Sequence, residues 1–122
     1  MPYADTDFFL ALLKPSDWLK ERARSVLKEH ADTITTSEVT FIELMLLAKR
    51  YDLDPVALTA AVMKICGMDD AMLLQAAINI EKGGNVFDSF HAAHCSDAII
   101  SSDDVFDTLL GLERIKLERQ QG

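Results

Sequence analysis

The chain opens with a few apolar residues that end at Asp5 and give way at once to an amphipathic segment, residues 8–13. This change of pattern predicts a short strand that turns directly into a helix, with Asp5 and Asp7 at the junction. In open α/β sheets, sites are built at the carboxyl ends of the strands. The opening stretch therefore predicts a fold class and also the place where acidic groups would act.

The later segments continue the alternation of strand and helix. We expect strands at 33–36 and 97–101, an edge strand at 114–118, and either a minimal strand or a connection at 65–68. Helices are expected at 8–13, 18–30, 38–51, 55–64, 70–82, 86–95 and 103–110. Four of them follow residues typical of helix N-caps, namely Ser16, Ser37, Asp54 and Asp69. This order predicts an α/β fold with a mostly parallel sheet, in which helices outweigh strands.

Length and charge restrict the classes of function. The 122 residues predict one domain, residues 1–118, followed by a C-terminal tail, residues 119–122. No apolar run approaches the roughly 20 residues of a membrane span, and no secretory pattern is present, so we expect no membrane contact and a cytoplasmic protein. Cys66 and Cys95 are expected to be free thiols. The net charge of −8 argues against a broad basic surface for nucleic acid, but a metal site made of carboxylates would itself add negative charge.

Four acidic residues stand in settings where acids are uncommon. Asp5 and Asp103 follow predicted strands, whereas Glu43 and Asp88 lie between apolar residues of predicted helices. Carboxylates are rarely buried unless they are paired or bound to a metal. Hard oxygen ligands suit Mg²⁺ or Mn²⁺, which orient a water and offset the charge of a phosphate. If the four acids converge, phosphodiester hydrolysis is the natural reaction.

The residues alone leave simpler interpretations open. Asp5 and Asp103 would also serve as helix N-caps, and Glu43 would face solvent if the phase of its helix is misjudged. Asp88 and His91 share a helix spacing that would suit zinc, with His94 three residues further on. The basic stripe of Lys20, Arg24 and Lys28 fits a track for RNA phosphates, although a solvated helix face balanced by nearby acids is the favoured interpretation.

Taken in order, four segments resemble the motifs of the PIN-domain family, which includes the VapC-type toxin ribonucleases. The matching segments are Asp5-Thr6-Asp7, residues 37–43 ending at Glu43, residues 88–93 beginning at Asp88, and residues 101–106 around Asp103. The chain departs from the family at Asp7, where Asn is more common. Asp104 directly follows Asp103, although the spacing to Phe106 favours Asp103 as the motif residue.

The resemblance implies a three-layer α/β/α fold with a short, mostly parallel central sheet and helices in excess. It implies a Mg²⁺- or Mn²⁺-dependent endoribonuclease whose catalytic and metal-binding residues are Asp5, Glu43, Asp88 and Asp103. Supporting roles then fall to Thr6, Asp7, Ser101 and Asp104. The partners it implies are an RNA substrate, an antitoxin protein and a second copy of the chain in a homodimer.

Two other functions are weighed against this one. A PIN-like domain without turnover would act as a binding or scaffold module, but such a module gains nothing from clustered acids. Asp5-Thr6-Asp7 also resembles the nucleophile motif of haloacid-dehalogenase-like phosphatases, in which Asp5 would form a phospho-aspartate. The chain is short for that family, and no motif lysine is apparent after an apolar strand.

Overall fold

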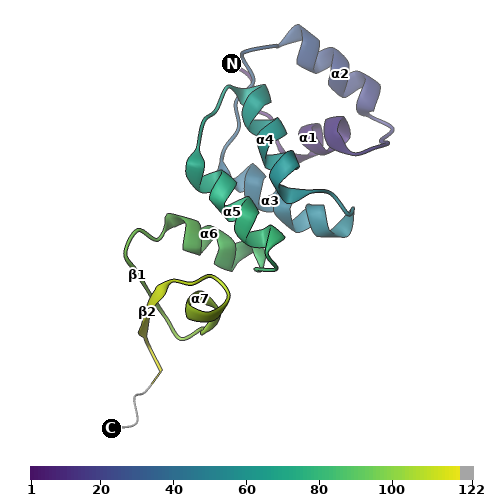
Figure 1. Ribbon diagram of the computed structural model, residues 1–122. Helices are drawn as coiled ribbons and strands as arrows, with labels where there is room; N and C mark the ends of the chain where they lie inside the picture. Colours follow the sequence, from purple (N-terminus) through teal and green to yellow (C-terminus); the bar gives the residue numbers. More distant parts are fainter. Residues whose placement is uncertain (119–122) are drawn as a thin grey trace.

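The structure is a computed structural model, and it describes residues 1–118. The predicted tail, residues 119–122, lies outside the described residues. The elements follow the chain in the order shown in Figure 1. They are α1 (Thr6–Leu13), α2 (Lys20–Glu29), α3 (Glu38–Arg50), α4 (Pro55–Cys66), α5 (Ala71–Glu81), α6 (Val86–His94), β1 (Ala98–Ser101), α7 (Val105–Thr108) and β2 (Glu113–Lys116).

Side-chain caps set the starts of several helices. The Asp54 carboxylate accepts hydrogen bonds from the backbone N–H groups of Val56 and Ala57, with Pro55 at the first position of α4. Both predictions about this start are confirmed. In the same way, Asn85 accepts a hydrogen bond from the backbone N–H of Asp88 at the start of α6. Short polar side chains therefore fix where these helices begin.

Two predicted caps are wrong, and a third, Ser37, stands at the N-cap position of α3 without a side-chain hydrogen bond to the helix. The cap of α5 is Asp70 rather than Asp69, so the helix begins one residue later. Ser16 does not cap α2, which begins after Leu19 without a side-chain cap. Ser16 is not the cap because a turn separates it from α2. In this turn the Asp17 carboxylate accepts a hydrogen bond from the backbone N–H of Leu19.

The core lies among the helices of residues 6–94, which we call the helical body. Its largest fully buried side chains include Phe9, Phe41, Leu44, Met45 and Val62, which come from α1, α3 and α4. Helices α5 and α6 pack against each other, and α6 also packs on α3. One contiguous cluster of buried residues runs from Phe9 to Phe90, so the body is held by a single core.

The strands form two separate pairings. β1 and β2 are parallel, with Ile100 opposite Ile115, which confirms the predicted strands near 97–101 and 114–118. The expected strands at the chain start and at 33–36 meet in one parallel bridge between Tyr3 and Thr35, which we call the N-terminal bridge. The 65–68 segment is not a strand: Ile65 and Cys66 are the last residues of α4, which ends at a left-handed Gly67.

The α/β class, the parallel pairing and the excess of helices are confirmed. Figure 1 shows that β1, α7 and β2 stand together at one end of an elongated molecule, beyond α6, while the chain start lies near the other end. We call residues 98–118 the C-terminal unit. Within the described range, no helix combines the length and apolarity needed to cross a membrane. Cys66 and Cys95 are free, and partial burial raises the pKa of the Cys66 thiol.

Candidate active site

The first two acids are linked through a buried threonine. Asp5 ends the N-terminal strand, and its carboxylate accepts a hydrogen bond from the backbone N–H of Asp7 at the start of α1. The next residue, Thr6, is buried and donates its hydroxyl to the Glu43 carboxylate at 2.9 Å. Glu43 is exposed on α3 although its neighbours in sequence are core residues. We call Asp5, Thr6 and Glu43 the N-terminal half-site.

The other two acids share a cavity between α6 and the C-terminal unit. Asp88, from the first turn of α6, and Asp103, from the loop after β1, line a cavity of about 370 Å³ together with His91. Asp103 accepts a hydrogen bond from the backbone N–H of Val105, while its own N–H donates to the Ser101 hydroxyl, each at 3.0 Å. We call Asp88, Ser101 and Asp103 the C-terminal half-site.

The structure thus brings the four predicted acids together as two pairs. Over residues 1–118, no three His, Cys, Asp or Glu side chains are grouped so that they would hold a metal ion. Asp103 belongs to the C-terminal unit, between β1 and α7, and this unit stands at the end of the molecule away from the chain start (Figure 1). Both half-sites offer hard oxygen donors of the kind that Mg²⁺ and Mn²⁺ prefer, so the donor chemistry fits such an ion. Only a closer approach of the two pairs would complete a four-acid set.

The predicted supporting residues differ in what they contact. The Thr6 hydroxyl donates a hydrogen bond to the Glu43 carboxylate, and the Ser101 hydroxyl accepts one from the backbone N–H of Asp103. Asp7 is exposed and lines an apolar groove with Arg22. Asp104 stands at the N-cap position of α7 without a side-chain cap bond, whereas the Asp103 carboxylate bonds the first helical N–H. Asp5 and Asp103 therefore both act as caps, as the simpler interpretation expected, while one or more of their oxygens stay in reach of solvent.

The histidines and the basic stripe do not support their alternative functions. His91 lines the cavity of the C-terminal half-site, but His94 lies 3.0 Å from the Glu38 carboxylate instead, so a zinc group of Asp88, His91 and His94 does not form. Lys20 donates its ammonium group to the carbonyls of Leu12 and Lys14 and so closes the end of α1. Arg24 pairs with Glu21, which favours the solvated-face interpretation of the stripe.

Two residues near the half-sites were missed by sequence reasoning. The Tyr3 hydroxyl lies 2.6 Å from the Ser37 hydroxyl, and this hydrogen bond, followed by one to Thr40, lowers the pKa of the phenol. Arg114 is almost fully buried and donates to the Ser101 carbonyl at 2.8 Å. Hydrogen bonds to Glu118 and then Asp107 raise its pKa. The sequence signal that could have identified this buried cation is the position of Arg114 within a strand of alternating apolar and polar residues.

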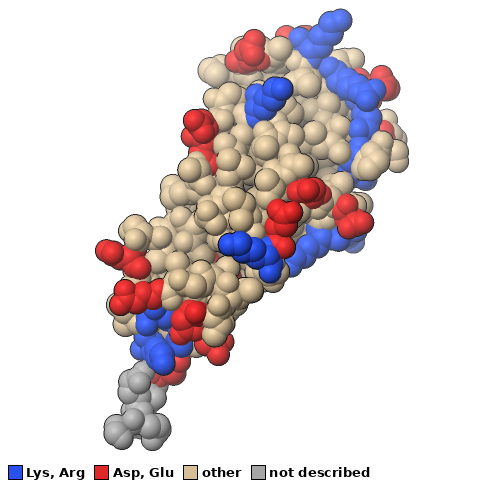
Figure 2. Space-filling view, in the orientation of Figure 1, with Lys and Arg blue, Asp and Glu red and all other residues tan. Residues whose placement is uncertain are grey.

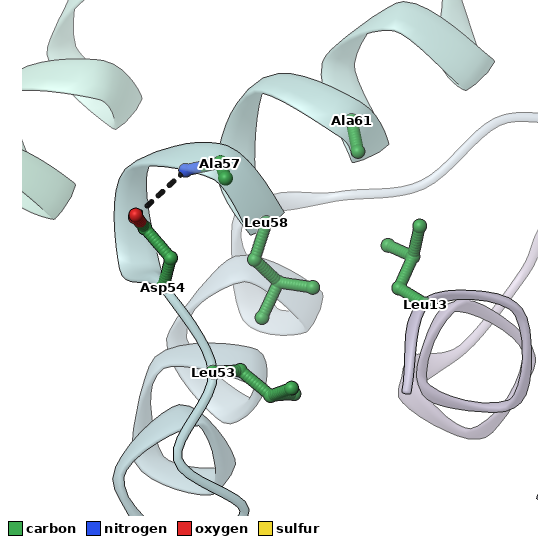
Figure 3. A pocket seen from close by; sticks show the side chains of 6 residues that line it. All are labelled: Leu13, Leu53, Asp54, Ala57, Leu58 and Ala61. Carbon is green, nitrogen blue, oxygen red and sulfur yellow. Dashed lines mark hydrogen bonds between the residues drawn. The ribbon is translucent and has the colours of Figure 1, made fainter. Parts of the chain in front are cut away.

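A third hollow has no catalytic chemistry. A cavity of about 170 Å³ lies between α1 and α4, and Figure 3 shows its apolar lining side chains, Leu13, Leu53, Ala57, Leu58 and Ala61. Its single acidic side chain is Asp54, which is turned to the backbone N–H of Ala57 as the cap of α4. On the face seen in Figure 2, basic side chains gather over α2 and acids surround the C-terminal unit. Within residues 1–118, the two half-sites therefore have donor groups suited to phosphate chemistry, and this cavity does not.

A model of the PIN domain matches residues 3–109, which is most of the chain and includes all four acids. The chain belongs to the PIN-domain family. The resemblance drawn from the four motifs is thereby confirmed. Comparisons with curated proteins and with solved structures give no match. PIN domains are typically nucleases that act on nucleic acid and generally use divalent metal ions, which supports an enzyme of this broad class.

Proposed function

We propose that the protein is a Mg²⁺- or Mn²⁺-dependent endoribonuclease that hydrolyses RNA phosphodiester bonds with Asp5, Glu43, Asp88 and Asp103. The observation that carries this proposal is the N-terminal half-site. An exposed carboxylate on a helix of core residues is held by the hydroxyl of the residue next to Asp5. A helix surface needs no such bond for stability, but a metal ligand needs a fixed orientation. The PIN membership supports the same chemistry.

In this proposal each acid of the chain has its own role in the reaction. When bound, a divalent ion supplies positive charge for the phosphate and makes a water a better nucleophile. Asp5, Asp88 and Asp103 would hold it through carboxylate oxygens. The Thr6 hydroxyl occupies Oε1 of Glu43, which leaves Oε2 to bind through water or to orient the attacking water. No serine or cysteine serves as a nucleophile, so Cys66 and Cys95 are dispensable for the reaction.

The same proposal extends to the biological setting. We propose a cytoplasmic toxin of a toxin–antitoxin pair, because the resemblance is to the VapC-type ribonucleases. An antitoxin would block the acidic site with a basic side chain, since a positive charge is attracted to a cluster of carboxylates. A neighbouring open reading frame for a small DNA-binding protein would support this role, and its absence would count against it.

The alternatives fit the observations less well. A scaffold without turnover gives no reason for Thr6 to hold Glu43 in place. A haloacid-dehalogenase-like phosphatase would need a free Asp5 nucleophile and a different fold, and family membership argues against it. RNA binding without cleavage in the presence of Mn²⁺ would favour the scaffold.

Cleavage of single-stranded RNA tests the proposal. We expect wild-type protein to cut with Mn²⁺ and to stop in EDTA. Asp5→Asn should lose activity while it keeps the cap of α1, because Asn caps helices as well as Asp. Asp69→Asn is the matched control, since Asp69 is exposed and does not cap α5. Activity that survives in EDTA or in Asp5→Asn would show that the mechanism is wrong.

A further inference from the structure

The side chain of Asn85 makes two hydrogen bonds to one residue at the start of α6. Its Oδ1 atom accepts from the backbone N–H of Asp88 at 2.9 Å, which is the ordinary bond of a helix cap. Its Nδ2 atom donates to Oδ2 of the Asp88 carboxylate. Because a backbone N–H can only donate, it fixes the amide oxygen on that side and turns the amide nitrogen toward the carboxylate. The cap and the contact with the carboxylate are therefore two parts of one arrangement.

The side-chain caps of three other helices in the body are aspartates. Asp5, Asp54 and Asp70 accept backbone N–H groups at the starts of α1, α4 and α5, and an ionised carboxylate can only accept. An aspartate at position 85 would cap α6 equally well, but it would place a second negative charge against Asp88. Asparagine supplies the same cap oxygen together with an N–H donor. The neighbouring carboxylate therefore explains the residue type at this position better than the helix alone does.

The turn before Asn85 fixes its place relative to two helices. The backbone N–H of Gly84 donates to the Asn79 carbonyl at 3.0 Å, and the Asn79 side chain donates to the Ser89 carbonyl at 3.3 Å. A Cβ atom at Gly84 would lie 2.7 Å from the Ser89 hydroxyl oxygen and 3.0 Å from the Asn79 carbonyl oxygen, so this close approach requires glycine. The Asn85 carbonyl then accepts from the N–H of Ser89. The backbone of Asn85 is thus held to both α5 and α6.

The donor that Asn85 offers is neutral, which matters for a carboxylate that binds a cation. A lysine or arginine beside Asp88 would offset the negative charge that attracts a metal ion, whereas an amide N–H orients the carboxylate and leaves its charge intact. Within residues 1–118, no lysine or arginine forms an ion pair with Asp88. The amide occupies Oδ2, and over the same residues Oδ1 has no hydrogen-bond partner. Since Asp88 lines the cavity that it shares with Asp103, Oδ1 is the atom left for an ion there.

We propose that Asn85 is a positioning residue that orients the Asp88 carboxylate for a divalent ion. The inference rests on the proposed function, because it takes Asp88 as one of the metal ligands. It goes beyond that function by assigning metal affinity to a side chain that does not itself touch the ion. Thr6 has the same relation to Glu43, since it also donates from a neutral group to one carboxylate oxygen. The two acids that lie on helices are thus each oriented by a neutral donor.

Manganese binding measured by calorimetry separates positioning from capping. Asn85→Gly removes the amide donor but introduces a residue type that N-cap positions tolerate, so the fold should persist. Its affinity for Mn²⁺ should fall by about 10-fold, the usual cost of losing a group that orients a metal ligand. Asp70→Gly is the matched control, because it removes the cap bonds to Met72 and Leu73 on the neighbouring helix and belongs to neither half-site. This control should bind Mn²⁺ as wild-type protein does.

RNA cleavage provides a second readout. At limiting Mn²⁺, Asn85→Gly should cut RNA about 10-fold more slowly than wild-type protein, and excess Mn²⁺ should recover most of the rate because Asp88 is still present. Asp88→Asn loses the ligand itself and should remain slow. Asn85→Ser keeps an oxygen for the Asp88 N–H and lacks the amide donor, so it replaces the glycine variant if circular dichroism shows that the latter does not fold.

The outcomes distinguish this inference from the proposed function. If wild-type protein cuts RNA, unchanged Mn²⁺ affinity in Asn85→Gly or an equal loss in Asp70→Gly overturns the role of Asn85 alone. A slow rate in Asn85→Gly that excess Mn²⁺ does not raise also overturns it, because the residue would then act on the reaction instead of on metal binding. If wild-type protein binds Mn²⁺ without cutting RNA, the affinities decide the role of Asn85. If it neither binds Mn²⁺ nor cuts RNA, both proposals fail.

Discussion

The helical body and the C-terminal unit are built from the same kinds of residue but are stabilised very differently. In the body, Phe41 and Leu44 belong to a core that extends through five helices. In the C-terminal unit, Phe106 is 3% exposed, yet it lies outside that core, and the aliphatic side chains of its sheet face solvent. The contrast shows that a segment can have its local structure specified by its own strand pairing without belonging to the main core.

The largest effect is expected in the body. Phe41→Ala removes a fully buried ring from α3 and leaves a cavity, so the free energy of unfolding should fall by about 3–5 kcal/mol. Urea unfolding followed by circular dichroism measures this change. Phe87→Ala is the matched control, because Phe87 is exposed and its loss should change stability by less than about 0.5 kcal/mol. Equal losses for both rings would contradict the described core.

The second largest effect is expected on RNA cleavage, when an acid of a half-site is replaced. Asp103→Asn should reduce RNA cleavage by about 100-fold or more, because Asp103 is a metal ligand in the proposed mechanism, while the cap on Val105 remains. Asp104→Asn is its neighbour control and should stay close to wild-type activity, since its side chain caps no backbone group of α7. If Asp104→Asn reduces RNA cleavage more than Asp103→Asn does, the motif residue is Asp104 and not Asp103.

The Thr6 contact should have a smaller effect. Thr6→Val keeps the shape of the buried side chain but removes the hydroxyl that donates to Glu43, so cleavage should fall by about 10-fold. Thr6→Ser restores the donor and should recover most of the activity. A Val variant as active as wild-type protein would mean that the orientation of Glu43 is unimportant.

A substitution at Phe106 tests whether the C-terminal unit and the helical body unfold independently. Phe106→Ala should abolish hydrogen-exchange protection in β1 and β2 and change the unfolding free energy of the body by less than about 1 kcal/mol. Exchange followed by mass spectrometry on peptides from residues 98–116 provides the measurement. Loss of protection throughout α3 and α4 as well would show that the unit and the body unfold together.

The smallest effect concerns Tyr3. Its hydrogen bond to Ser37 lowers the pKa of the phenol below the ordinary 10.0, so phenolate absorbance should begin to rise at a lower pH than for a free tyrosine. Because the folded pKa is the lower one, this group favours the folded state above the unfolded pKa, and the benefit disappears as the pH falls through the folded pKa. Ser37→Ala should move the absorbance step upward. An unchanged step would contradict the hydrogen bond.

Local chemistry allowed much of the fold to be predicted. Asp54 followed by Pro55 identified a helix start because one residue caps and the next has a preset backbone angle. Ser16 misled because the competing turn at Asp17 depends on one carboxylate orientation that no periodicity reveals. Residues 97–101 were identified as a strand because their apolar run is short and rich in isoleucine.

The site was harder to predict than the elements that carry it. The four acids were predicted from motifs, and all of them lie within residues 3–109, the range that the family model matches. Within residues 1–118 the acids lie as two separate pairs, and a common site would need pairing between strands nearly 100 residues apart, which local patterns do not encode. Arg114 was missed for a different reason: its partners Asp107 and Glu118 are close in sequence, but the burial of its side chain depends on the packing of α7 and β2.

Manganese binding measured by isothermal titration calorimetry tests the central claim most directly, because it needs neither the correct RNA nor turnover. Wild-type protein should bind Mn²⁺, whereas Asp5→Asn and Asp103→Asn should each weaken binding by about 10-fold or more. Asp69→Asn should bind as wild-type protein does, since that acid belongs to neither half-site. Equal binding by all four proteins would contradict a metal site shared by Asp5 and Asp103.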